Sequence, residues 1–178
     1  MHSSFTAGWP ELFLSRLCSA IKRVMGKSVS IVSWIVICLF LGYMSSIMQS
    51  EALAEWYPVL VRSPLTPPGW VFPVAWTVLY ILMGVSAGML YGIRSIYTRF
   101  LYVLFGLQLL LNILWSVFFF YMRSPIMGFM DILLLDMFVL LYFIGAYVVK
   151  RSAALIMLPY VLWLVFATYL NGYIMLYN

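Results

Sequence analysis

Few side chains in this chain are of the types that commonly act in catalysis. Two of them are the carboxylates of one apolar run. Asp131 and Asp136 both lie in the run 126–149. Five residues apart, they lie about 140° apart around an α-helix, so they cannot form a facing acid–base pair and general acid–base catalysis is not indicated. Asp131 is expected to reach the membrane interface near the helix start, whereas the deeper Asp136 is the stronger candidate for a buried polar role. A proton pathway needs only one carboxyl group and stays open.

Thiol and imidazole chemistry is scarce. Cys18 and Cys38 are the two cysteines, without disulfide or metal-type spacing, and the single histidine is His2. We therefore predict no catalytic residue, no metal site and no covalent cofactor. A ligand would be held by shape, ring stacking and hydrogen bonds.

Polar side chains recur with helical spacing along 100–122. Gln108, Asn112 and Ser116 are four residues apart and share one stripe of a helix. Facing lipid, each amide or hydroxyl would stay unpaired, so the stripe is expected to face the protein interior. These groups bond either to other helices or to a ligand, and their spacing does not decide between the two.

Aromatic residues form a second stripe in 70–92. Phe72, Trp76 and Tyr80 are four residues apart, and Pro73 stands in the first helical turn, where its missing N–H is harmless. The same spacing continues with three glycines: Gly84, Gly88 and Gly92. Rings at one end and close-packing glycines at the other predict a wide mouth above a tight base. Ordinary helix packing is the alternative for both features.

A comparable stripe lies near the C-terminus. Trp163, Ala167 and Asn171 are four residues apart, with Tyr160 beside them, and Pro159 predicts a kink. A ring, a small residue and an amide on one stripe form either a cavity wall or a plain packing surface.

The elements that position these stripes are membrane helices. Of the residues, 66 % are hydrophobic and 8 % charged, and the mean hydropathy is +1.06. Lipid must therefore be the solvent for most of the chain. We predict an all-α integral membrane protein, a five-transmembrane-helix bundle whose short breaks make sequential helices antiparallel neighbours. The expected spans lie near 30–49, 70–92, 100–122, 126–149 and 153–176.

Two segments lie outside these spans. Residues 51–69 are too long for a simple turn, and Trp56 and Tyr57 favour a lid over one end of the bundle rather than a mobile surface loop. Residues 1–28 are typical of a basic amphipathic helix on a membrane surface, with a targeting segment as the alternative. The five-helix domain is then 29–178.

The basic residues predict an orientation. With five spans, eight fall on the N-terminal side and two on the other, which puts the N-terminus in the cytoplasm of a bacterial cell. Topology accounts for most of the net charge of +5, so no nucleic-acid partner is predicted. The eight are Arg16, Lys22, Arg23, Lys27, Arg94, Arg99, Lys150 and Arg151, and the two are Arg62 and Arg123.

Three segments together carry a family resemblance: PPGWVFPVAWTVLYILMG, QLLLNILWSVFFF and LPYVLWLVFATYLN. In this order they resemble motifs of the translocator protein and tryptophan-rich sensory protein family, and EWYPVLVRSPLTPP resembles its long first loop. The resemblance covers roughly residues 30–178. It implies a five-helix bundle, often a homodimer, whose first loop closes a pocket for porphyrins and other hydrophobic ligands. The membrane would be a bacterial cell membrane, or the mitochondrial outer membrane in a eukaryote.

The resemblance also implies site residues. Trp76 and Trp163 resemble the pocket tryptophans and Trp56 the loop tryptophan, while Gln108 could join Asn112 in holding polar edges of the ligand. The full set of expected ligand-binding residues is Trp56, Trp76, Tyr80, Gln108, Asn112, Phe119, Tyr160 and Trp163.

Three functions compete. The leading hypothesis is a receptor-like protein in which protoporphyrin IX or another tetrapyrrole stacks between Trp76 and Trp163 under the first loop, with membrane lipids and a second copy as further partners. A light-dependent porphyrin-degrading enzyme is the second, although no nucleophile, acid–base pair or metal site supports it independently. A small-molecule transporter is the third, although five spans without a detectable inverted repeat suit alternating access poorly.

Overall fold

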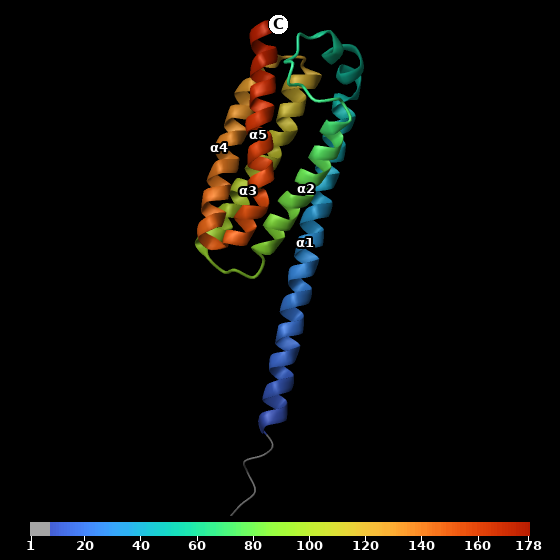
Figure 1. The fold of residues 1–178 in the computed structure, drawn as a ribbon. Coiled ribbons are helices and arrows are strands. Elements are labelled where there is room, and N and C mark those ends of the chain that lie inside the picture. Colours follow the sequence, from blue (N-terminus) through green and yellow to red (C-terminus); the bar gives the residue numbers. More distant parts are fainter. Residues whose placement is uncertain (1–7) are drawn as a thin grey trace, which may run out of the picture.

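The computed structural model describes residues 8–178, with side chains from residue 13 onward. Figure 1 shows helices running side by side, with α1 projecting far beyond the others at its N-terminal end. Each of the five α-helices is long and apolar enough to cross a membrane, which confirms the predicted all-α five-helix membrane fold. They are α1 (Gly8–Glu55), α2 (Val71–Met89), α3 (Ile96–Ser116), α4 (Pro125–Val149) and α5 (Arg151–Tyr177). The 3-10 helix η1 (Tyr57–Val59) follows α1, and the π-helical turn η2 (Val117–Tyr121) follows α3.

Helix α1 is one unbroken element of 48 residues. At 1.5 Å per residue it is about 72 Å long, more than twice the roughly 30 Å of hydrocarbon in a bilayer. The sequence suggested a separate surface segment, 1–28, before the first span. The structure carries the helix through that boundary because no proline interrupts it between Pro10 and Pro58. Residues 1–7, which include His2, lie outside the described residues.

Serine side chains cap the starts of α3 and α4. The Ser95 hydroxyl accepts a hydrogen bond from the Tyr97 N–H at the start of α3, and Ser124 accepts one from the Met127 N–H at the start of α4. Pro125 follows at the first position of α4, where no N–H is needed. These caps allow the connections between antiparallel helices to stay short.

The glycines of α2 pack against the backbone of α1. A Cβ atom added at Gly84 would lie 2.5 Å from the Ile35 backbone, and one at Gly88 would meet the Ile31 backbone. These two glycines therefore form the predicted tight base. The prediction was wrong for Gly92, because α2 ends at Met89 and Gly92 lies in the following turn with a φ of +80°, a conformation that favours glycine.

A buried hydrogen-bond group ties α2 to α4 and α5 at the same depth as the glycines. The Ser86 hydroxyl lies 2.9 Å from the Tyr142 hydroxyl and donates to the Ala153 carbonyl at 2.8 Å. All three residues are buried. The half of the bundle away from the connection between α1 and α2 is therefore closely packed around α2.

Candidate ligand cavity

A cavity of about 530 Å³ lies above the glycine base, between the helices and the connection from α1 to α2. Its volume falls within the roughly 300–1,000 Å³ of typical small-molecule sites. Eight aromatic side chains from α2, α3, η1, η2 and α5 line it. They are Tyr57, Phe72, Trp76, Tyr80, Trp115, Phe119, Phe120 and Trp163.

The two predicted aromatic stripes meet along one wall of this cavity. Phe72, Trp76 and Tyr80 from α2 and Trp163, Ala167 and Asn171 from α5 all line it. The Phe72 and Trp163 rings pack edge to face with centroids 6.1 Å apart. Trp76 packs in the same way on Tyr160 at 6.4 Å. The pocket tryptophans that the sequence predicted thus lie on the surface of one cavity.

A polar network crosses the cavity floor. The Tyr80 hydroxyl donates to Asn112 Oδ1 at 2.6 Å, and Asn112 Nδ2 donates to the Tyr160 hydroxyl at 3.2 Å. Tyr80 and Asn112 line the cavity, whereas Tyr160 is fully buried beneath them. Both ends of the Asn112 amide are therefore occupied by protein, and its visible role is to fix two tyrosines.

Gln108 lies one helical turn from Asn112 and is not among the lining residues. Its side chain is fully buried, and neither amide atom has a hydrogen-bond partner in the described part of the chain. The predicted polar stripe does face the interior along its whole length. The structure brings Asn112 and Ser116 to the cavity and leaves Gln108 in the packed base.

Helix α1 supplies polar lining that the sequence analysis missed. Gln49 Nε2 donates to the Ser116 hydroxyl at 2.7 Å, and both residues line the cavity. Small and polar residues at helical spacing were the available signal in the first span: Gly42, Ser45, Ser46 and Gln49. Their shared face turns toward α2 and α3.

The π-helical turn η2 builds the far wall. The Met122 N–H reaches back five residues to the Val117 carbonyl, and this wider turn leaves Phe119 and Phe120 both buried and both in the lining. Trp115 stacks on Phe119 with centroids 5.2 Å apart and an interplanar angle of 9°. Phe119, one of the expected ligand-binding residues, thus lines the cavity.

Trp56 and Tyr57 have different positions at the start of the first loop. Trp56 packs edge-on against Phe119 at 5.4 Å and is not among the lining residues, whereas Tyr57 does line the cavity. The loop ring on the cavity surface is therefore Tyr57, and Trp56 supports Phe119.

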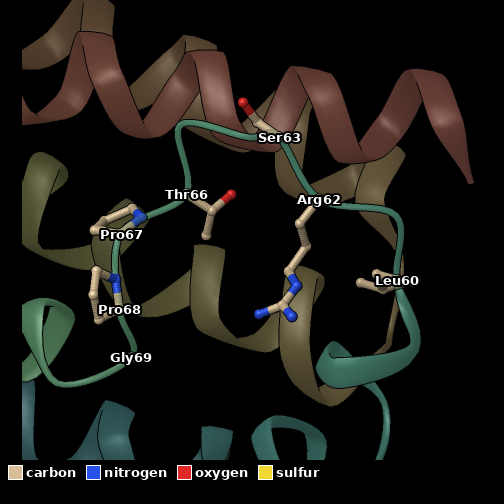
Figure 2. A pocket seen from close by; sticks show the side chains of 7 residues that line it. All are labelled: Leu60, Arg62, Ser63, Thr66, Pro67, Pro68 and Gly69. Carbon is tan, nitrogen blue, oxygen red and sulfur yellow. The ribbon is translucent and has the colours of Figure 1, made fainter.

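Helix α5 holds the first loop in place. The Val61 N–H donates to Asn178 Oδ1 at 2.9 Å, and Asn178 Nδ2 donates back to the Val61 carbonyl at 3.1 Å. The Ser63 and Tyr169 hydroxyls are 2.9 Å apart. Figure 2 shows Ser63 pointing toward α5, while Arg62 and Thr66 point into the space that the loop encircles. That hollow, about 510 Å³, shares four lining residues with the cavity: Arg62, Thr66, Pro67 and Gly69.

The two aspartates of α4 do not line the cavity. Asp131 is only 6 % exposed and its Oδ2 has no hydrogen-bond partner among the described residues, whereas the half-buried Asp136 accepts a hydrogen bond from Thr168 at 2.7 Å. The sequence favoured Asp136 for a buried polar role, but Asp131 is the more buried of the two, because it shares the buried face of α4 with Gly128 and Leu135. In the described residues, no group of three or more His, Cys, Asp or Glu could hold a metal ion.

The fold and the cavity define a class, the five-helix integral membrane proteins with a ring-lined cavity beneath the first loop. Residues 34–177 match the sequence model of the TspO/MBR family. The chain is 37 % identical over 144 residues to the tryptophan-rich protein TspO of Chlorobaculum tepidum, covering 80 % of this chain and 91 % of the relative. Identity to the protein of the same name from Archaeoglobus fulgidus is 34 % over 150 residues, covering 84 % and 97 %. The translocator protein of Ovis aries is 32 % identical over 120 residues, covering 66 % and 71 %. This chain belongs to the TspO/MBR family.

Proposed function

We propose that the chain is a receptor-like membrane protein that binds a porphyrin or a related tetrapyrrole in the cavity beneath its first loop. The observation that carries the proposal is the cavity lining, in which eight aromatic rings surround about 530 Å³. Flat apolar π-systems gain from stacked and edge-to-face contacts with such rings. Tyr80, Asn112, Gln49 and Ser116 in the lining are already hydrogen-bonded to other protein groups, so shape and ring contacts would provide most of the affinity.

Equilibrium titration of the purified protein with protoporphyrin IX tests this site. The Trp76→Phe, Trp163→Phe double variant should bind about tenfold more weakly, since two large ring contacts are reduced. Trp70→Phe is the matched control, because Trp70 is 69 % exposed and does not line the cavity. Unchanged affinity in the double variant would reject the site. Chromatography of the bound porphyrin after illumination separates a binding protein, which returns it intact, from a degrading enzyme.

We also propose a bacterial cell membrane with a cytoplasmic N-terminus. The eight-to-two distribution of basic residues supports this orientation, and bacterial relatives support the membrane. Alkaline phosphatase fused after Asn178 should then be active, and an inactive fusion would contradict the orientation.

A homodimer is part of the same proposal. Because α1 already covers Gly84 and Gly88, the two copies would meet on another face. Light scattering of the purified protein in detergent measures the assembly mass, and a monomer at all concentrations would contradict a dimer.

A further inference from the structure

We propose that Arg62 makes the cavity select ligands that carry a carboxylate at the loop end. This inference rests on the proposed function, because it concerns the same cavity. Among the described residues that line the cavity, Arg62 is the only one with a charged side chain. The rest of the lining is apolar, aromatic, hydroxyl or amide in character, so a single positive charge marks one end of an otherwise neutral site.

The carboxylates nearest in sequence to Arg62 are occupied elsewhere. Arg123 Nη2 lies 2.9 Å from Glu51 Oε1 and 3.7 Å from Glu55 Oε2. In the part of the chain that the structure describes, these are the ion pairs present, and neither includes Arg62. Two arginines at the same end of the bundle thus differ: Arg123 closes the turn between α3 and α4 onto α1, and Arg62 keeps its charge without a carboxylate partner.

The backbone on both sides of Arg62 is fixed. The Val61 backbone donates one hydrogen bond to Asn178 and accepts one from it, and the Ser63 hydroxyl is bonded to that of Tyr169. The guanidinium lies over the Tyr57 ring, with its carbon 5.4 Å from the ring centroid. Figure 2 shows the side chain pointing into the hollow that the loop encircles. Arg62 is therefore positioned before any ligand arrives.

Tyr57 does not neutralise this charge. Burial raises the pKa of the Tyr57 phenol above its ordinary value of 10.0, and the nearby Arg62 only partly offsets the rise. The phenol therefore stays protonated at neutral pH. Its ring contact orients the guanidinium without supplying a negative charge.

The chemistry of a guanidinium identifies the group it would bind. Its planar N–H fork pairs with two carboxylate oxygens at once. A flat ring system with a carboxylate on one edge could bury its apolar body among the cavity rings and leave that edge at Arg62. The Tyr80–Asn112–Tyr160 network offers no competing cation.

Protoporphyrin IX and its dimethyl ester are the probes, because they share one ring system and differ in their acid groups. The unmodified protein should bind the diacid roughly tenfold tighter than the diester. Arg62→Gln should remove this preference by weakening diacid binding alone, and Arg62→Lys should keep part of it. Arg99→Gln is the control, since it removes an exposed positive charge at the opposite end of the bundle.

The outcomes separate this inference from the function on which it rests. If Arg62→Gln retains the diacid preference, or if Arg99→Gln loses it equally, carboxylate selection by Arg62 is overturned while porphyrin binding stands. If the unmodified protein binds neither porphyrin, the proposed function fails and the selection falls with it.

Discussion

The two halves of α2 pack in opposite ways. Toward the loop, Phe72, Trp76 and Tyr80 line the cavity with large rings. Toward the other end, Gly84 and Gly88 bring the α1 backbone into direct contact. The residues of α2 at intervals of four therefore line the cavity near the loop. Within three turns, the same series forms a close-packed seam with α1.

This difference shows that side-chain volume sets where the cavity ends. In lipid, helices associate mainly through van der Waals packing and hydrogen bonds, so small residues decide how closely two backbones approach. The glycine seam brings α1 and α2 together below the cavity, and the rings of α2 line the cavity above it. Changes in the two halves should thus have separable effects on stability and on binding.

The largest effect is expected from filling the seam. Gly84→Ala together with Gly88→Ala places two methyl groups against the backbone of α1, which cannot move aside as a side chain would. We expect a loss of about 2–3 kcal/mol of stability, measured as a lower midpoint of thermal unfolding in detergent. Gly106→Ala is the control, because a Cβ there meets nothing within 4 Å. Equal midpoints for the two variants would show that the seam is not tight.

A smaller effect is expected from breaking the network at the boundary of the two halves. Asn112→Leu removes the acceptor of the Tyr80 hydroxyl and the donor to the Tyr160 hydroxyl. Leaving buried polar groups unpaired should cost about 1–3 kcal/mol in chemical unfolding. Tyr160→Phe removes only one of these bonds and should cost less. A larger loss in Tyr160→Phe than in Asn112→Leu would contradict the bridging role of Asn112.

The smallest effect is expected at Gln108. Its buried amide has no partner in the described residues, so Gln108→Met should change stability by less than about 1 kcal/mol or raise it. Porphyrin affinity should not change, because Gln108 belongs to the packed half. Weaker porphyrin binding by a stably folded Gln108→Met protein would show that Gln108 contributes to the ligand site.

Helical periodicity in the sequence predicts a large part of this arrangement. Apolar run lengths predicted five spans, and spacing by four residues correctly grouped the three rings of α2 with each other and Trp163 of α5 with Ala167 and Asn171. The same spacing also grouped Gln108 with Asn112 and Ser116. Periodicity defines a helix face but not the depth at which a neighbouring cavity ends, so it could not separate Gln108 from the other two.

Other features depend on contacts between helices. Asp131 and Asp136 were ranked by depth in their helix, whereas the burial of each is set by the face of α4 that meets its neighbours. The π-helical turn was not predicted, because the run of three phenylalanines is also compatible with an α-helix. The position of Trp56 beside Phe119 of that turn was likewise not predicted, because it is a contact between residues 63 positions apart in the sequence.

The hydrogen bonds that hold the first loop to the C-terminal helix also affect the entropy of ligand binding. Fixing a residue's backbone costs about 1–2 kcal/mol at 25 °C, and a cover that ordered only around its ligand would subtract that cost from the affinity. Here Asn178 and Tyr169 fix Val61 and Ser63 in the folded chain itself. The entropic cost of ordering these two positions is therefore part of the free energy of folding. A ligand that reaches the cavity does not have to order Val61 and Ser63 as it binds.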